Sequence, residues 1–178
     1  CDSRSGKQGP VEIVALDHYL HEMRLFKSRG ELSAMRKAGR ISAAAQVRAM
    51  RACRPGLTEA HIHAELVHEY MVNGCEPAYP PIVGGGENAC VLHYIANDQP
   101  LMDGDLLLID AGCEYDGYAS DITRTYSARP GIFADMIVAM DSAQLAMCDE
   151  VTAGTSFADL HLGAHQKIAA LLEDFDIV

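Results

Sequence analysis

The chain has 178 residues, of which 49% are hydrophobic and 22% charged, a balance that is ordinary for a folded globular domain and argues against a disordered chain. Its formal net charge of -11 and the lack of any run of lysines and arginines argue against a surface that follows nucleic-acid phosphates, so we expect no nucleic-acid partner. We also expect no membrane partner, because no apolar run reaches the about 18 residues of a spanning helix and no signal-peptide pattern stands at the start.

The cysteines are scattered, and no two of them form a C-x-x-C pair. Several stand inside apolar runs, a setting that favours buried, reduced thiols over a disulfide framework or a zinc knuckle. We therefore expect a reducing compartment and a cytoplasmic location. The six are Cys1, Cys53, Cys75, Cys90, Cys113 and Cys148.

The first predicted helix follows a polar, glycine-rich start and the short run VEIVAL, neither of which makes a domain alone. Ser28 and Glu31 have the spacing of a capping box, in which each side chain bonds the other residue's backbone N–H. The pattern predicts a helix from there to Cys53, where Pro55-Gly56 ends it.

Thr58 is a second N-cap candidate, and apolar residues then recur at helical spacing up to Asn73-Gly74. This predicted helix carries His61, His63 and His68. The three do not share one face at i, i+4 spacing, so a solvated polar face explains them better than a metal site does.

Prolines and three consecutive glycines interrupt the segment 78–94 before the short apolar run Cys90-Val91-Leu92, which His93 follows directly. The glycines lack the Lys-Ser/Thr of a P-loop and the spacing of a dinucleotide motif. A phosphate cradle is therefore weakly supported, and a flexible wall near a substrate fits as well.

The stretch 104–126 predicts a β-hairpin, because Asp116-Gly117 lies between two apolar-rich runs. With Asp116-Gly117 as a two-residue turn, Tyr115 pairs with Tyr118 and the rest of the register follows.

In this register Asp110 falls opposite Thr123 and Gly112 falls opposite Asp121. Asp110 and Asp121 then lie diagonally on one face, roughly 7–8 Å apart at the backbone, so their carboxylates can converge. Two ionised carboxylates this close need a shared proton or a cation between them. From spacing alone two interpretations stay open: a divalent metal site, or an ordinary Asp-rich turn with one carboxylate in solvent.

Two more helices are predicted after the hairpin, over residues 134–151 and from Ser156 toward Phe175. Together they repeat the earlier pattern of helix, glycine turn, Thr/Ser cap and helix at an offset of 98 residues, from Thr58 to Ser156. His161 and His165 have zincin spacing, but the required glutamate is absent, so surface histidines explain them better.

Four stretches resemble the aminopeptidase P family of metallopeptidases: HEMRLFKS (21–28), CRPGLTE (53–59), IVGGGENACVLHY (82–94) and DGDLLLIDAGCEYDGYASDITRTY (103–126). The resemblance implies an α+β chain, the first half of a pita-bread fold, with helices packed on a curved antiparallel sheet and apparently truncated. On this basis residues 1–27 are the tail of a missing N-terminal domain and linker. Residues 28–178 are the N-terminal half to two-thirds of the catalytic domain.

The same resemblance implies two divalent metal ions, manganese in this family, held by two Asp, one His and two Glu. They activate a bridging hydroxide that cleaves peptides with proline in second position. By position, Asp110 and Asp121 match the aspartate ligands, Asp121 being the bridging one. His93 matches a histidine that hydrogen-bonds the substrate or the developing tetrahedral intermediate, and Tyr79 matches a tyrosine that lines the site.

The family's remaining His and Glu ligands are not in this chain, so we expect the chain alone to be inactive. For the full-length protein we expect a homo-oligomer. Two alternatives stay open: a prolidase, which cleaves Xaa-Pro dipeptides, and a metal-free pita-bread protein that binds peptides or partner proteins.

Overall fold

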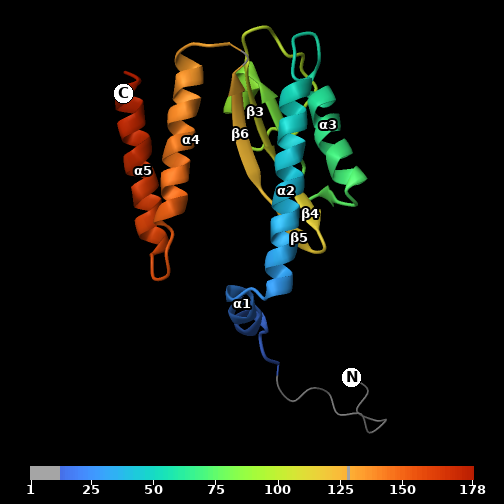
Figure 1. Cartoon of the computed structure of the whole chain (residues 1–178), viewed down its shortest axis with the longest axis vertical. Helices are drawn as coiled ribbons and strands as arrows, with labels where there is room; N and C mark the ends of the chain where they lie inside the picture. The colour runs from blue at the N-terminus through green and yellow to red at the C-terminus, as the bar shows by residue number, and fades with distance from the viewer. Residues whose placement is uncertain (1–12, 128) are drawn as a thin grey trace.

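Two long helices form where the capping signals predict them. The computed structural model describes residues 13–127 and 129–178. In it, α2 (Arg29–Ala52) starts at a complete capping box between Ser28 and Glu31. The next helix, α3 (Glu59–Val72), starts at Thr58. The two helices pack side by side along the sheet (Figure 1).

Two small antiparallel sheets follow one another along the same hairpin. The first joins strands β2, β3 and β6 in that order, and the second joins β1, β4 and β5. Their bounds are β1 Glu76–Pro77, β2 Ile82–Gly85, β3 Leu106–Ala111, β4 Cys113–Tyr115, β5 Tyr118–Ala119 and β6 Ile122–Ser127. A 3-10 helix, η2 (Gly86–Cys90), leaves the end of β2.

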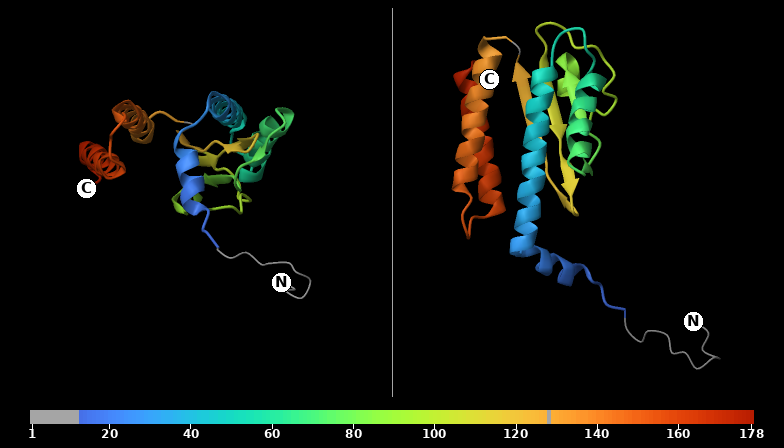
Figure 2. Two further views of the ribbon diagram at one scale, coloured as in Figure 1. Left: turned by 90° about the horizontal axis from the view of Figure 1, so that it is seen from below. Right: turned by 45° about the vertical axis from the view of Figure 1, so that its right-hand side comes forward.

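The core lies between the helices and one face of the sheet. Burial alternates along β3, where Leu107, Ile109 and Ala111 are buried and the residues between them are only half-buried. Alternate residues of a strand point to opposite faces, so the buried set faces α2 and α3. Seen along the strands, both helices lie on one side of the sheet (Figure 2), and the face that carries Asp110 is the other one.

Polar contacts fix α2 against the hairpin at three levels. Near its start, Glu31 accepts a hydrogen bond of 2.8 Å from the Tyr118 hydroxyl. In its middle, the Ser42 and Ser120 hydroxyls lie 2.7 Å apart. One turn later, Gln46 donates to the Ile122 carbonyl oxygen at 2.9 Å and accepts from the hydroxyl of Tyr126.

Helices α4 (Ile132–Glu150) and α5 (Phe157–Asp174) form a helical hairpin beside β6 (Figure 1). Both agree with the predicted helices, and Ser156 caps α5 by accepting from the backbone of Ala158 and Asp159. The starts of α3 and α5, Glu59 and Phe157, are 98 residues apart, so the predicted repeat is present as two helix pairs. The second pair is largely exposed to solvent, because α4 has no buried residue and α5 has only Leu171.

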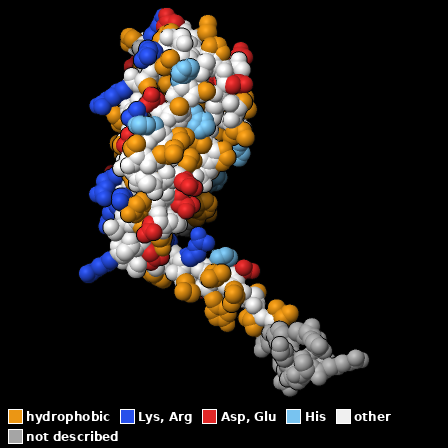
Figure 3. Space-filling model, turned by 90° about the vertical axis from the view of Figure 1, so that its right-hand side faces the viewer, with side chains coloured by type: hydrophobic (Ala, Val, Ile, Leu, Met, Phe, Trp, Pro, Cys, Tyr) orange, Lys and Arg blue, Asp and Glu red, His pale blue; other side chains and the backbone are white. Residues whose placement is uncertain are grey.

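Helix α1 (Asp17–Leu25) was not predicted from the sequence. It has no buried residue, and Tyr19, Leu20 and Met23 are exposed on it. Hydrophobic side chains accordingly gather over this helix in Figure 3. Its start carries no capping signal, because the N-cap residue is Leu16, whose side chain cannot accept a hydrogen bond from the first turn.

None of the helices in the described part of the chain combines the length and the apolar character needed to cross a bilayer. The five cysteines in that part are free thiols: Cys75 and Cys113 are buried, Cys53 is half-buried, and Cys90 and Cys148 are exposed. Cys1 lies outside the described residues.

Candidate metal and catalytic site

The hairpin register agrees with the prediction. Tyr115 pairs with Tyr118, and Asp110 pairs with Thr123. Asp116 and Gly117 have φ angles of 54° and 80°, the left-handed pair that defines a tight two-residue hairpin turn. The turn therefore determines which face of the sheet receives Asp110.

Between the two aspartates the ladder is interrupted, since β3 ends at Ala111 and β6 begins at Ile122. Gly112 allows a close backbone approach there: a Cβ on it would lie 1.7 Å from the Ser120 carbonyl oxygen. The Ser42 hydroxyl of α2 reinforces this junction by accepting from the Cys113 N–H at 3.0 Å. The backbone that precedes Asp121 is thus held by a glycine contact and by a helix side chain.

The carboxylates of Asp110 and Asp121 converge on one phenol. The Tyr79 hydroxyl, from the segment between β1 and β2, lies 2.6 Å from Asp110 Oδ1 and 2.8 Å from Asp121 Oδ1. Burial, together with these two carboxylates, raises the pKa of Tyr79 well above its usual value, so the phenol keeps its proton. Because the phenol keeps its proton, its hydrogen bonds neutralise neither carboxylate, and its single hydrogen serves both.

The donor chemistry of this site fits a divalent cation, because carboxylate oxygens are the hard ligands that such ions take. For such an ion, Asp110 and Asp121 would supply only part of a coordination shell of about six donors. Over residues 13–127 and 129–178, no group of three or more His, Cys, Asp or Glu side chains is placed to hold a metal. The described residues by themselves therefore do not complete a metal site.

His93 lies on an exposed turn after η2. Its φ of 55° is left-handed, a conformation that non-glycine residues adopt rarely and that is concentrated at functional sites. Val91 and Leu92 beside it are 53% and 91% exposed, so the short apolar run belongs to the surface. His93 is therefore a surface residue and not part of the core.

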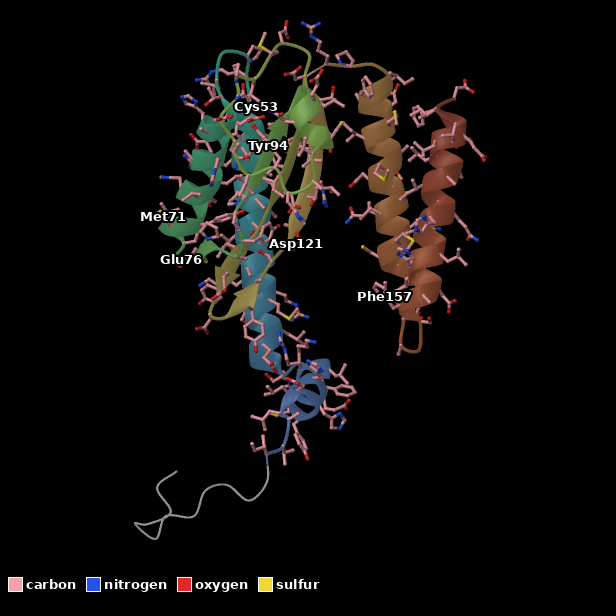
Figure 4. The ribbon with its side chains drawn as sticks, turned by 180° about the vertical axis from the view of Figure 1, so that it is seen from behind. Cys53, Met71, Glu76, Tyr94, Asp121 and Phe157 are labelled. Atoms are coloured by element: carbon pink, nitrogen blue, oxygen red, sulfur yellow. The ribbon has the colours of Figure 1, made fainter. Side chains whose placement is uncertain are left out.

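The η2 turn passes over the face of the sheet that carries Asp110. Gly84 pairs with Leu108, two residues along β3 from Asp110, so both positions point to that face. A Cβ on Gly84 would lie 2.8 Å from the carbonyl carbon and oxygen of Asn88. The segment 86–99, here called the His93 loop, follows β2. The first of the three glycines thus lets this loop approach the face that carries Asp110. In Figure 4, Tyr94 of this loop and Asp121 both lie in the sheet-bearing part of the molecule, while Phe157 stands on the separate helical hairpin.

Two buried polar residues that hold this loop could not be singled out from the sequence pattern. Glu59 is fully buried, and Asn97 nearly so, with its Oδ1 accepting from the Val83 N–H at 2.8 Å. Glu59 ends the CRPGLTE stretch, which was the only available signal. A glutamate in the first turn of a helix ordinarily faces solvent, and this one does not.

Four of the other histidines have local contacts. His61 Nδ1 lies 2.8 Å from the Thr58 hydroxyl, where it completes the cap of α3. His63 Nδ1 lies 3.3 Å from Asn97 Nδ2. On α5, His161 and His165 place their Nε2 atoms 3.1 Å apart. His61 is exposed, in agreement with the predicted solvated face, whereas His63 is half-buried. His161 and His165 are exposed, as predicted for surface histidines.

Comparison with known proteins gives concordant results. Residues 33–176 match metallopeptidase family M24. The Xaa-Pro aminopeptidase of Escherichia coli (strain K12) is 51% identical over 125 residues, which are 70% of this chain and 28% of that protein. The Xaa-Pro dipeptidase of Shewanella loihica is 38% identical over 174 residues, which are 97% of this chain and 39% of that protein.

Solved structures show the same pattern. The aminopeptidase PepP of Pseudomonas aeruginosa superimposes with a TM-score of 0.89 at 46% identity, over 99% of this chain and 41% of that one. Zinc-substituted E. coli aminopeptidase P in complex with product gives a TM-score of 0.90 at 39% identity, over 99% and 41%. These matches confirm the predicted fold class, and this chain spans about 40% of the length of those structures.

Proposed function

The chain belongs to metallopeptidase family M24, and from that premise we propose that the protein containing it is an Xaa-Pro aminopeptidase. It would hydrolyse the bond between an N-terminal residue and a following proline, so its substrates are peptides with proline in second position. The relatives named above as Xaa-Pro aminopeptidase and aminopeptidase P support this assignment.

One observation carries the proposal: the Tyr79 hydroxyl lies within hydrogen-bond distance of both Asp110 and Asp121. Two ionised carboxylates that accept from the same hydroxyl group lie close together and repel each other. A divalent cation bound between them would remove this repulsion. The geometry therefore favours a metal-dependent hydrolase over a binding protein.

Asp110 and Asp121 would hold one side of a pair of divalent ions, for which we propose Mn²⁺ because oxygen-rich sites suit it. When bound, such ions supply a hydroxide nucleophile near neutral pH and polarise the carbonyl group under attack. Tyr79, protonated beside them, would line the site and keep the two carboxylates at a fixed separation.

His93 would donate a hydrogen bond to the substrate carbonyl oxygen or to the negative charge that develops on it. A donor already in place stabilises that charge as it forms, an effect worth about 3 kcal/mol for a single donor in well-studied hydrolases. The exposed ring and the left-handed backbone of His93 fit a side chain presented to a ligand.

The matched test compares two aspartates of the same hairpin. Asp121→Asn removes a carboxylate from the site, and we expect the protein that carries this chain to lose at least about a thousandfold in kcat/KM on an Xaa-Pro peptide. Asp116→Asn should leave activity unchanged, because asparagine suits the left-handed turn position. Equal activities would contradict the proposal.

The 178-residue chain alone should not cleave, since two carboxylates leave each ion short of donors. The measurement is hydrolysis of an Xaa-Pro peptide with this polypeptide as the only protein present. Cleavage at a normal rate would show that the donor set has been misassigned.

A dipeptidase is the second candidate, because the Xaa-Pro dipeptidase of Shewanella loihica matches 97% of this chain at 38% identity. Substrate length separates the two: an aminopeptidase accepts longer peptides, whereas a dipeptidase cleaves Xaa-Pro alone. Metal content separates both from a metal-free binding protein, for which mass spectrometry would find no bound manganese, cobalt or zinc.

A further inference from the structure

Glu59 is a buried carboxylate that receives four hydrogen bonds from one loop. Its Oε1 accepts from the Gly85 N–H at 2.8 Å and from Asn88 Nδ2 at 3.0 Å. Its Oε2 accepts from the Tyr94 hydroxyl at 2.7 Å and from the Gln99 N–H at 3.0 Å. An ionised carboxylate has about four acceptor sites, so this one is saturated.

The four donors explain why a charge is tolerated in the core. Burial by itself raises the pKa of Glu59, but the four donors together lower it below its usual value. The carboxylate therefore stays ionised, and its hydrogen bonds are of the stronger, charge-assisted kind.

The donors bracket His93 along the chain. Gly85 and Asn88 precede it, Tyr94 follows it directly, and Gln99 ends the loop. The far end has a second attachment, because Asn97 Nδ2 donates to the Pro81 carbonyl oxygen at 2.7 Å. The loop is thus tied on both sides of its exposed tip.

The backbone at the exposed tip of the loop, around His93, has to be held in place by such hydrogen bonds. A left-handed backbone at a non-glycine residue costs about 1–3 kcal/mol and persists only where the surroundings hold it. At His93 the φ is 55°, while the side chains next to it, Val91 and Leu92, are exposed and hold nothing. Tyr94 is the neighbour that reaches the core, and it does so through Glu59.

We propose that Glu59 is the positioning residue for His93: through Tyr94 and the backbone of the loop, it fixes the imidazole over the face of the sheet that carries Asp110. The role of His93 in this inference rests on the proposed function. The positioning of the His93 loop by Glu59 does not depend on that function. Glu59 touches no substrate and acts only through the loop.

The first test measures loop order. In Glu59→Gln an amide NH₂ replaces one acceptor oxygen and faces donors, so part of the network must break. We expect the Val91 amide, which donates to the Asn88 carbonyl oxygen, to exchange at least about tenfold faster, with broadened His93 ring signals. The Ile109 amide of β3 should change little. The control is Glu87→Gln, an exposed carboxylate of the same loop.

Equal acceleration at Val91 and Ile109 would overturn the proposal, because Glu59 would then support only global stability. No acceleration at either would overturn it as well. If Glu59→Gln does not fold, Tyr94→Phe removes one donor and should give a smaller acceleration confined to the loop.

The second test measures catalysis in the protein that carries this chain. Glu59→Gln should lower kcat about tenfold on an Xaa-Pro peptide with KM within about twofold, because a displaced donor weakens transition-state stabilisation. An unchanged kcat would overturn the proposal. If the wild-type protein cleaves no such peptide, the proposed function fails, while the exchange result still decides whether Glu59 holds the loop.

Discussion

The helix pair α2–α3 and the helix pair α4–α5 share one local pattern and differ in burial. Both pairs have a glycine turn and a Thr/Ser cap before the second helix. The first pair buries Ala38, Ala45, Ala49, Ile62, Leu66 and Tyr70 completely. The second pair buries only Leu171. Local signals therefore determine where helices form, and the sheet determines which helices belong to a core.

The candidate site lies in the well-buried part of the chain and not in the exposed helix pair. Asp110, Asp121 and the His93 loop are all held by contacts within the sheet unit, which consists of the two sheets with α2 and α3. Helices α4 and α5, in contrast, contact mainly each other (Figure 2). Stability and the candidate chemistry are concentrated in one part of the molecule.

The largest effect should come from truncating a core leucine. Leu66→Ala in α3 leaves a cavity in a fully buried position and should cost about 2–5 kcal/mol of unfolding free energy. Leu162→Ala in α5, where the side chain is 57% exposed, should change it by less than about 0.5 kcal/mol. Urea unfolding followed by circular dichroism measures both, and comparable losses would erase the distinction between the two helix pairs.

A glycine pair probes backbone packing in the same two regions. Gly112→Ala forces a Cβ into the Ser120 carbonyl oxygen and should cost about 1–3 kcal/mol or more, with Asp121 displaced. Gly163→Ala in α5 makes only ordinary contacts at 3.9 Å and should gain about 1 kcal/mol from helix propensity. Thermal unfolding of the two variants should shift the melting temperature in opposite directions.

Acid should weaken the sheet unit through Glu59. Because its pKa is lowered in the native state, its contribution to stability is complete above the ordinary glutamate value. That contribution is lost as the pH falls through the native pKa. Between about pH 5 and pH 3 the unfolding free energy should therefore fall less steeply in Glu59→Gln than in the wild type. Glu87→Gln should keep the wild-type slope; the same flattening in both variants would remove Glu59 from the explanation.

The smallest effect belongs to the ion pair that joins α4 and α5. Lys167 Nζ lies 2.8 Å from Glu150 Oε1, and the side chains are 32% and 50% exposed. Lys167→Met should change the unfolding free energy by about 0–1 kcal/mol, and added salt should abolish the difference. A larger, salt-insensitive loss would mean that the helical hairpin is held together more firmly than its exposure indicates.

Much of this structure follows from short-range patterns. Ser28 with Glu31, and Asp116 with Gly117, each determine a local geometry within a few residues, so the start of α2 and the hairpin register could be predicted. The convergence of Asp110 and Asp121 followed from that register.

Three features do not follow from such local patterns, because they depend on contacts between distant segments. For Tyr79 the family resemblance alone indicated a place in the site. Tyr79 meets the aspartates only after β1 and β2 have been placed. The left-handed backbone of His93 and the burial of Glu59 arise from the loop folding back over α3 and the sheet. The roles of His93, Tyr79, Asp110 and Asp121 in catalysis and metal binding stay predictions for the experiments above.

The polar contacts between α2 and the hairpin have one more consequence. Much of the buried face of α2 is alanine, and a row of methyl groups offers little to stop a helix from sliding along its own axis. Glu31, Ser42 and Gln46 spread three polar attachments over about 22 Å of helix. A shift by a single turn would mismatch all of them at once. The alanines thus allow α2 to pack closely against its neighbours, and the three polar contacts determine its position along its own axis.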